Sequence, residues 1–176
     1  MTNKNNIVAI VPVKGNSVRV KKKNLTKFAN SNLFKIKLKQ LKKTDCFKKI
    51  IISSENKKIL NYAKMNGFSI HLRDKFFSTS KVPMSDVYKN IASEIDGEYI
   101  AWINVTNPLC DEYIYQSAVK KFKTISKNYD CFLSAVKNKQ NYFYKNKPIN
   151  FKRTPWPRSQ DLQGLLSLSF AINILK

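Results

Sequence analysis

The sequence has few acidic residues, very little arginine and no long apolar run. Its 176 residues hold 33 lysines and arginines against 11 aspartates and glutamates, so the formal net charge is +22. Only four of these basic residues are arginines. Arginine is the side chain that forks onto phosphates and guanine edges, so its scarcity argues against a specific nucleic-acid partner. The excess of lysine, asparagine and isoleucine is typical of a compositional bias spread over a solvated surface.

Cysteine and histidine are also scarce. Three widely spaced cysteines and a single histidine predict neither a disulfide framework nor a zinc site, and they favour a reduced, cytoplasmic protein. No apolar run approaches the roughly 18 residues that a membrane span requires, and the polar segment Met1–Asn6 does not resemble a signal peptide. The length and the 43% apolar content predict one folded domain with a substantial core.

Apolar, β-branched runs alternate along the chain with segments of helical periodicity. Strands are expected at residues 7–13, 49–53, 68–72, 99–104, 131–136, 142–144 and 168–175. Helices are expected at residues 31–44, 55–66, 85–95 and 111–126. This β-α-β order predicts an α/β fold, a Rossmann-like arrangement of three layers with a mostly parallel sheet. The stretch 137–163, rich in Asn, Lys and Pro, is expected to leave that sheet.

The loop after the first expected strand is the first candidate site, because ligands of open α/β sheets bind beyond the carboxyl ends of the strands. From Pro12 to Asn24 it reads Pro-Val-Lys-Gly-Asn-Ser-Val-Arg-Val-Lys-Lys-Lys-Asn. Backbone N–H groups, the Ser17 hydroxyl and the basic side chains suit a polyphosphate. The loop has neither the Walker pattern nor the dinucleotide fingerprint. An ordinary solvated loop would have a similar composition, so composition leaves both interpretations open.

Several short motifs occur in one collinear order between residues 7 and 175. The first loop contributes six positions without a gap: Pro12, Gly15, Ser17, Arg19, Lys23 and Asn24. The later motifs are Ser53-Ser54-Glu55, Leu72-Arg73, Asp86-Val87, the segment 104–110, Gln160-Asp161-Leu162 and the segment 171–174. Together they resemble the acylneuraminate cytidylyltransferase family, also called CMP-N-acetylneuraminic acid synthetases, which activate acidic sugars.

The resemblance implies a nucleotidyltransferase fold and the transfer of CMP from CTP to an acidic, acylneuraminate-like sugar, with release of pyrophosphate, for surface polysaccharide synthesis. It assigns catalysis to Arg19 and Lys23. It assigns nucleotide binding to Lys14, Gly15, Asn16, Ser17, Arg19, Lys23, Asn24, Arg73, Ser85 and Asp86. It assigns sugar binding to Asn104, Thr106, Arg158, Gln160 and Asp161. The resemblance also implies magnesium on the phosphates, with unknown protein ligands, and it allows a homodimer.

The chain departs from the family pattern at several of these positions. Lys14 and Cys110 stand where the family has arginine, and Asn104 stands where it has glutamine. Ser159 occupies the position of an arginine that binds the sugar carboxylate, with Arg158 one residue away. The family continues beyond the position of Lys176 with an acidic pair for magnesium. We therefore expect a single cytidylyltransferase-like domain, residues 1–176, that lacks the usual C-terminal portion.

Two alternatives to the enzyme follow from these departures and from the charge. One is a truncated, catalytically impaired homologue that binds a nucleotide or a partner. The other, less favoured, is nonspecific nucleic-acid binding through the basic surface.

The remaining candidates each have a structural interpretation beside a functional one. His71 is expected to be a core or surface histidine rather than a general base, and Asp111 and Glu112 to cap a helix rather than bind metal. The aromatic segment 142–144 is expected to pack rather than to stack on a base. Trp156 is equally compatible with a lid over the acceptor and with a structural turn. The lysines of segment 35–43 are expected to form a solvated helix face, with a membrane-surface role less favoured.

Overall fold

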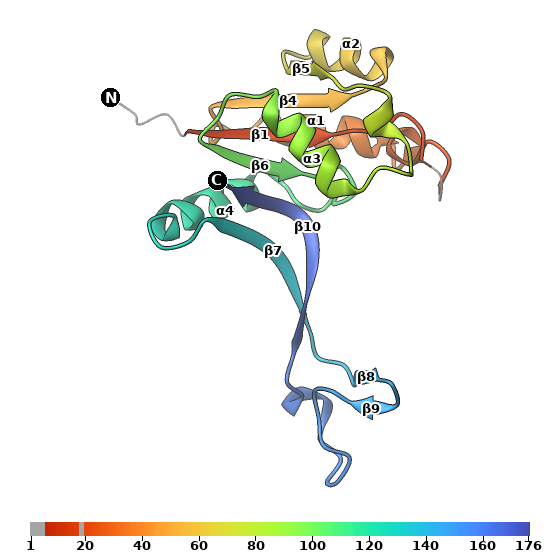
Figure 1. Ribbon diagram of the computed structural model, residues 1–176, viewed down its shortest axis with the longest axis vertical. Helices are drawn as coiled ribbons and strands as arrows, with labels where there is room; N and C mark the ends of the chain where they lie inside the picture. Colours follow the sequence, from red (N-terminus) through yellow and green to blue (C-terminus); the bar gives the residue numbers. More distant parts are fainter. Residues whose placement is uncertain (1–5, 18–19) are drawn as a thin grey trace. The chain divides into compact units, whose positions relative to one another are not determined.

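The structure is a computed structural model that describes residues 6–17 and 20–176 (Figure 1). The strands are β1 (Ile7–Pro12), β2 (Lys27–Phe28), β3 (Ser31–Asn32), β4 (Lys49–Ser54), β5 (Ser69–Leu72), β6 (Tyr99–Ile103), β7 (Cys131–Asn138), β8 (Phe143–Tyr144), β9 (Lys147–Pro148) and β10 (Leu165–Leu175). The helices are α1 (Leu33–Leu41), α2 (Lys57–Met65), α3 (Met84–Ser93) and α4 (Glu112–Ile125), with short 3-10 turns at Lys23–Leu25, Phe76–Ser78 and Ser159–Asp161. Every expected helix and strand is present, with its ends shifted by a few residues.

A six-stranded sheet in the order β5-β4-β1-β6-β10-β7 forms the centre of the fold. The strand β1 pairs in parallel with β4 and β6, and β4 pairs in parallel with β5. The strand β10 runs antiparallel to β6. The prediction of a mostly parallel sheet is therefore confirmed. The periodicity of the sequence did not predict that β10 pairs in the antiparallel direction.

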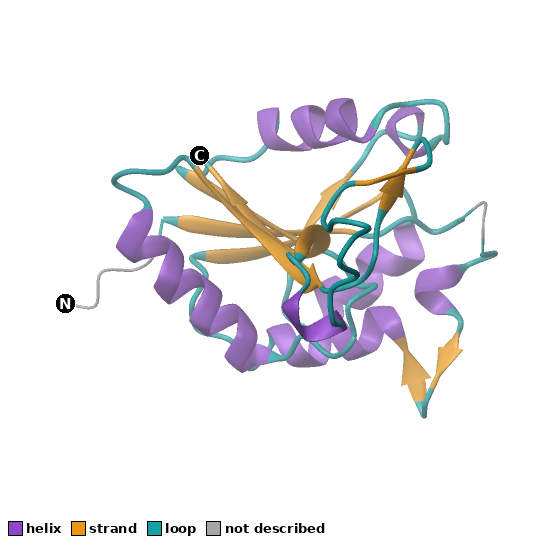
Figure 2. Ribbon diagram, turned by 90° about the horizontal axis from the view of Figure 1, so that it is seen from below, coloured by secondary structure: helices purple, strands orange, loops and turns teal. Residues whose placement is uncertain are grey.

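Helices cover both faces of the sheet (Figure 2), as the alternation of side chains along β1 requires. Ile7, Ala9 and Val11 belong to a core cluster that also contains apolar residues of α1, α2 and α4. Val8 and Ile10 point the other way, into a second cluster with residues of α3. Because both faces are covered, β1 reads as a continuous apolar run rather than as an alternating pattern.

Side-chain caps fix where three of the helices begin. The amide oxygens of Asn32 and Asn56 accept the N–H groups of Lys35 and Lys58 at 2.8 and 2.9 Å, at the starts of α1 and α2. The carboxylate of Asp111 accepts the N–H of Ile114 at 3.1 Å at the start of α4. The capping role expected of Asp111 is confirmed.

The chain divides into two compact units, Met1–Phe132 with Phe170–Lys176, and Leu133–Ser169. The second unit contains the segment that was expected to leave the sheet. In it the β8–β9 hairpin turns through Lys145 and Asn146, whose φ angles are 46° and 62°. The buried Asn150 holds this unit together, because its amide donates to Gln140 and Gln163 and accepts from the N–H of Tyr142.

Among the described residues, no helix has the length and the apolar character needed to cross a membrane.

Candidate functional site

The loop that follows β1 is closed at its base by its own residues. The buried side chain of Asn24 donates from Nδ2 to the Lys14 carbonyl at 3.1 Å, so the two ends of the loop meet. The N–H of Val13 donates to the Ser53 carbonyl at 2.8 Å, which attaches the loop to the carboxyl end of β4. Between these points, Ser17 and Lys23 are half-buried and Asn16 is exposed. The structure therefore gathers the predicted nucleotide-binding residues of this loop, except Arg19, which lies outside the described residues.

Glu55, directly after β4, is the carboxylate to which this loop is bound. One oxygen of its side chain accepts the backbone N–H of Gly15 at 2.7 Å. The other accepts Nη2 of Arg73 and the hydroxyl of Ser78, each at 3.0 Å. Arg73 is itself buried and also donates to the Val13 carbonyl at 3.4 Å. Arg73, predicted to bind nucleotide, thus contacts the loop through Glu55 and Val13.

The hydrogen bonds of Glu55 keep it ionised. Burial alone would raise the pKa of its carboxyl group, but backbone N–H groups, including that of Gly15, together with Arg73 and Ser78 lower the pKa below its ordinary value. A carboxylate that accepts from a backbone amide and a guanidinium is a strong, directional anchor. The base of the loop therefore carries an ionised carboxylate that is paired with Arg73.

Gly15 is a position where only glycine fits. A β-carbon added to Gly15 would lie 2.7 Å from Nδ2 and 3.0 Å from Cβ of Asn56. Asn56 cannot easily withdraw, because it caps α2. The glycine thus permits the close approach of the loop to the strand-to-helix junction of β4 and α2.

Ser85 and Asp86, also predicted to bind nucleotide, lie in the first turn of α3. Both side chains are exposed, and the Ser85 hydroxyl donates to the Asp86 carboxylate at 3.3 Å. A carboxylate in the first turn of a helix is favoured by the helix dipole. The helix dipole therefore accounts for an acidic residue at Asp86 on its own, and nucleotide binding remains a prediction.

The loop between β6 and α4 carries the predicted sugar-binding residues Asn104 and Thr106. The amides of Asn104 and Asn107 both donate to the Phe170 carbonyl, at 3.1 and 3.3 Å. Asn104 also bonds to the phenol of Tyr88, whose pKa is raised by burial. Thr106 is exposed. The Asn104 amide is thus bonded within the protein, and Thr106 is the side chain of the pair that faces solvent.

Lys37 corrects the expectation that the lysines of α1 form a solvated face. Lys35, Lys39 and Lys42 are exposed as expected, but Lys37 is fully buried. Its Nζ donates to the carbonyls of Asn107 and Cys110, at 2.9 and 2.8 Å, and to the hydroxyl of Tyr115 at 2.6 Å. The prediction fails at Lys37 because this position lies on the helix face that Phe34 and Leu41 bury.

The other predicted sugar-binding residues, Arg158, Gln160 and Asp161, belong to the second unit. Arg158 and Asp161 form an exposed ion pair at 2.7 Å, a kind of pair that contributes little to stability. Asp161 also lines a pocket of about 300 Å³ in this unit, together with Phe151, Pro155 and Pro157. Trp156 is exposed and packs edge-on against Phe151 with ring centroids 5.0 Å apart, which is compatible with a structural turn.

Histidine and the remaining candidates have structural partners. His71 bridges two elements, with Nδ1 2.9 Å from the Ser53 hydroxyl and Nε2 2.8 Å from the Glu94 carboxylate. Ser53 is fully buried, so this chain of hydrogen bonds does not present an accessible nucleophile. Glu112 accepts from Lys43 at 2.9 Å on the surface. In the second unit, Phe143 packs against Phe151 although its ring is half-exposed.

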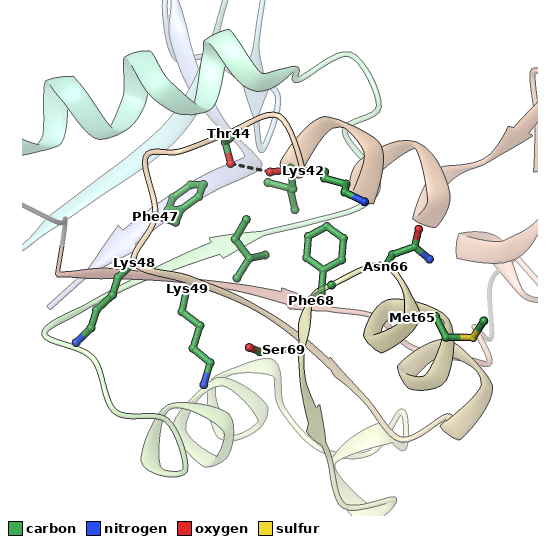
Figure 3. Close-up of a pocket in the computed structure, with 12 residues that line it drawn as sticks. Lys42, Thr44, Phe47, Lys48, Lys49, Met65, Asn66, Phe68 and Ser69 are labelled. Atoms are coloured by element: carbon green, nitrogen blue, oxygen red, sulfur yellow. Dashed lines mark hydrogen bonds between the residues drawn. The ribbon is translucent and has the colours of Figure 1, made fainter.

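A pocket of about 610 Å³ opens at the amino ends of β4 and β5, the end of these strands opposite to the loops described above (Figure 3). Apolar side chains that include Phe47 and Phe68 line it, and Lys42, Lys48 and Lys49 surround it. Ligands of open α/β sheets bind at the carboxyl ends. The pocket is therefore separate from the candidate site, and its lysines serve as controls for charge alone.

The magnesium ion that the resemblance implies finds no ready set of protein ligands in residues 6–17 and 20–176. No group of three or more His, Cys, Asp or Glu side chains in these ranges could hold a metal ion. Glu55, the carboxylate nearest to the loop, already uses both of its oxygens. We therefore assign no step of the reaction to a protein-bound metal.

Sequence reasoning missed Glu55 and Lys37 as parts of the site. Glu55 belongs to the motif Ser53-Ser54-Glu55. An acidic residue directly after a buried strand is a signal that could have identified it. Lys37 lies three residues after Phe34 and four before Leu41, so its place on the apolar stripe of α1 was visible in the sequence.

Comparisons with known proteins agree with this fold. The family model described as cytidylyltransferase matches residues 8–160. The chain belongs to the cytidylyltransferase family, a family of nucleotidyltransferases, and the resemblance seen in the motifs is confirmed at this level. The N-acylneuraminate cytidylyltransferase of Escherichia coli O18:K1:H7 (strain RS218 / NMEC) is 25% identical over 133 residues. The matched region covers 75% of this chain and 32% of that protein, so the chain spans about a third of the length of this relative.

Two solved structures illustrate the similarity of the fold. A CMP:2-keto-3-deoxy-manno-octonic acid synthetase complexed with CTP has a TM-score of 0.69 at 11% identity, covering 97% of this chain and 73% of that one. The bifunctional IspDF of Campylobacter jejuni has a TM-score of 0.66 at 18% identity, covering 97% of this chain and 40% of that one. At these identities the likeness concerns the fold, and the predicted nucleotidyltransferase fold is confirmed.

Proposed function

We propose that the protein transfers CMP from CTP to an acidic sugar and releases pyrophosphate. The observation that carries the proposal is the closed, basic loop from Lys14 to Asn24, which Glu55 binds at the carboxyl end of β4 in a chain of the cytidylyltransferase family. A loop of this kind, with Ser17 and Lys23 half-buried between its fixed ends, suits a triphosphate. The family match and the position of the loop support this assignment together.

The proposed reaction is an attack by a sugar hydroxyl oxygen on the α-phosphorus of CTP. The new bond joins this oxygen to the α-phosphorus, and the bond from the α-phosphorus to the oxygen that bridges to the β-phosphorus breaks. Pyrophosphate leaves with that electron pair, and the hydroxyl proton passes to solvent. Positioning and charge stabilisation supply most of the catalysis in such transfers. Lys23 and Arg19 are the groups that we assign to the developing negative charge.

The acceptor is proposed to be an acylneuraminate-like sugar used for surface polysaccharide synthesis. The name of the Escherichia coli relative supports this choice, because the relative matches three quarters of the chain. Thr106 from the β6–α4 loop is exposed and available to sugar hydroxyls. Arg158 of the second unit is the residue that we assign to the carboxylate of the sugar, and Gln160 and Asp161 remain predicted sugar-binding residues. Arginine is suited to a carboxylate through its planar fork.

We also propose a homodimer and a cytoplasmic location. The second unit exposes Leu133, Val136, Ile149, Leu166 and Leu168, each at 45% or more. Exposed apolar side chains such as these are what a partner subunit would cover. CTP is a cytoplasmic metabolite, and the three cysteines, none of which forms a disulfide, suit a reducing compartment.

Pyrophosphate release tests the proposal. The wild-type protein, CTP and magnesium are incubated with N-acetylneuraminic acid or with 2-keto-3-deoxy-manno-octonic acid, and ATP, GTP and UTP serve as nucleotide controls. We expect pyrophosphate release that requires both CTP and an acidic sugar. Stabilisation by CTP in a thermal-shift assay, without pyrophosphate release from CTP in the presence of either acid, would instead support the impaired, nucleotide-binding homologue.

A further inference from the structure

Side chains of helix α1 donate hydrogen bonds to backbone carbonyls of the β6–α4 loop. The turn from Asn107 to Cys110 is closed by the Cys110 N–H, which donates to the Asn107 carbonyl at 3.2 Å. The Nζ of Lys37 lies beneath this turn and donates to the carbonyls of the same two residues. Between them, Nε2 of Gln40 donates to the Pro108 carbonyl at 2.7 Å. Three carbonyls of one turn are thus bound by two side chains of a single helix.

The chemistry of these two side chains indicates that the contact is directional rather than a consequence of packing. A lysine is rarely buried, because its ammonium loses its hydration, and here three acceptors compensate for that loss. The amide oxygen of Gln40 is buried with no hydrogen-bond partner among the described residues. An apolar side chain at position 37 would avoid the lost hydration of the ammonium, and one at position 40 would avoid the unpartnered amide oxygen. Each change would, however, leave carbonyls of the turn without their donors.

The same loop is also bound by the Phe170 carbonyl, which accepts from the amides of Asn104 and Asn107. Phe170 adopts a φ of 54°, a conformation that few residues other than glycine take up, and it lies two residues before Ile172, where the pairing of β10 with β6 begins. The loop is therefore held by two sets of hydrogen bonds, one to side chains of α1 and one to the Phe170 carbonyl. Thr106 is the exposed residue between Asn104 and the turn that begins at Asn107.

We infer that Lys37 is a positioning residue: by binding the carbonyls of Asn107 and Cys110, it fixes the β6–α4 loop in the conformation in which Thr106 meets the acceptor sugar. The inference rests on the proposed function for the identity of that ligand. Lys37 touches neither substrate nor phosphate in this account. It acts through the backbone of the turn, and it favours binding of the sugar rather than binding of CTP.

The test compares Lys37→Met with Lys39→Met, a substitution on the exposed face of the same helix. Gln40→Met is a milder second variant, which removes only the hydrogen bond to Pro108 and keeps the core intact if Lys37→Met folds poorly. Amide hydrogen exchange is measured without ligand for each full-length protein. We expect exchange to rise about tenfold or more in residues 104–110 in Lys37→Met, and less in Gln40→Met, with little change in the strands of the sheet.

Steady-state kinetics supply the second readout, with N-acetylneuraminic acid and CTP as the varied substrates. We expect KM for the acid to rise about tenfold in Lys37→Met while KM for CTP stays within about twofold. Loss of folded protein alone would lower kcat and leave both KM values unchanged. Equal changes in both KM values, or exchange that rises uniformly over the sheet, would overturn the inference.

The two proposals fail in distinguishable ways. A wild-type protein that releases no pyrophosphate overturns the proposed function, and the exchange of residues 104–110 still decides whether Lys37 holds the loop. A protein that is active, but whose Lys37→Met variant keeps the wild-type KM for the acid, overturns the inference and leaves the proposed function standing.

Discussion

The carboxylate of Glu55 accepts the backbone N–H of Gly15 at 2.7 Å, and this contact joins the loop after β1 to the carboxyl end of β4. Arg73 completes the arrangement, because its guanidinium lies 3.0 Å from the other oxygen of the same carboxylate. A loop that binds a triphosphate must hold its cations in place without ligand, so that little ordering remains to be done when CTP arrives. The hydrogen bond between Gly15 and Glu55 fixes the backbone at the start of this loop.

Glu55→Gln is expected to destabilise the protein by about 3 kcal/mol, because it leaves the buried Arg73 without a charged partner. The pKa of the Glu55 carboxyl group is lowered in the folded protein, so its contribution to stability is present at neutral pH. The contribution is lost as the pH falls below the ordinary value of 4.5 and through the lower folded value. Urea unfolding of wild type and variant at several pH values checks this. The gap in unfolding free energy should narrow toward acid, and a gap that is independent of pH would contradict the assignment.

Lys23→Ala is expected to weaken CTP binding by about tenfold or more, because a charge-assisted contact to phosphate contributes on the order of 1.5–3 kcal/mol. Isothermal titration with CTP and magnesium measures the effect. Lys42→Ala is the matched control, since it removes the same charge at the pocket shown in Figure 3, away from the loop. Equal losses in the two variants would show that net charge, rather than the loop, attracts the nucleotide.

Gly15→Ala is expected to abolish CTP binding and to destabilise the fold by about 1–3 kcal/mol, because the new methyl group would overlap Asn56. Gly67→Ala is the control for a glycine substitution as such. Gly67 has a φ of +84° and no atom within 4 Å of an added β-carbon, so the variant should lose about 1 kcal/mol and still bind CTP. Calorimetry and thermal unfolding of the two variants separate the effects. Normal CTP affinity in Gly15→Ala would refute the close-approach argument.

Lys37 should make the stability of the protein depend on pH in the alkaline range. Burial lowers the pKa of Lys37 from 10.5 to about 8, although Cys110 and Asp111 act in the opposite direction. Between these two values the unfolded chain binds more protons than the folded one, so the contribution of Lys37 to stability rises with pH from about 8 to 10.5. The comparison with Lys37→Met isolates this rise from the titration of tyrosines and cysteines. Parallel pH profiles for the two proteins would contradict the burial of the charge.

The strands and helices could be predicted because their signals are local. The run from Ile7 to Val11 is apolar because helices cover both faces of β1, and the same burial is what makes the run visible in the sequence. The antiparallel direction of β10 was not visible, since pairing direction depends on the path of the segment before it. The capping role of Asp111 was predictable because it depends only on its position before a helix.

The residues of the site could be predicted where they belong to a sequence motif. Contacts that depend on tertiary packing could not be predicted. The loop from Lys14 to Asn24 could be identified from residue types and order, but the hydrogen bond from Gly15 to Glu55 joins segments forty residues apart. Lys37 was misjudged because abundant lysine in α1 suggested solvent exposure. Its spacing from Phe34 and Leu41 was the better guide, since helical geometry rather than composition decides which side chains are buried.

Pyrophosphate release decides most directly whether the protein transfers CMP from CTP to an acidic sugar. The wild-type protein is given CTP, magnesium and N-acetylneuraminic acid, with 2-keto-3-deoxy-manno-octonic acid as the second acceptor and Lys23→Ala as the impaired variant. We expect CTP-dependent and acid-dependent release of pyrophosphate by the wild type, reduced by about 10²-fold in Lys23→Ala. Absence of pyrophosphate with both acids, or equal release by Lys23→Ala, would contradict it.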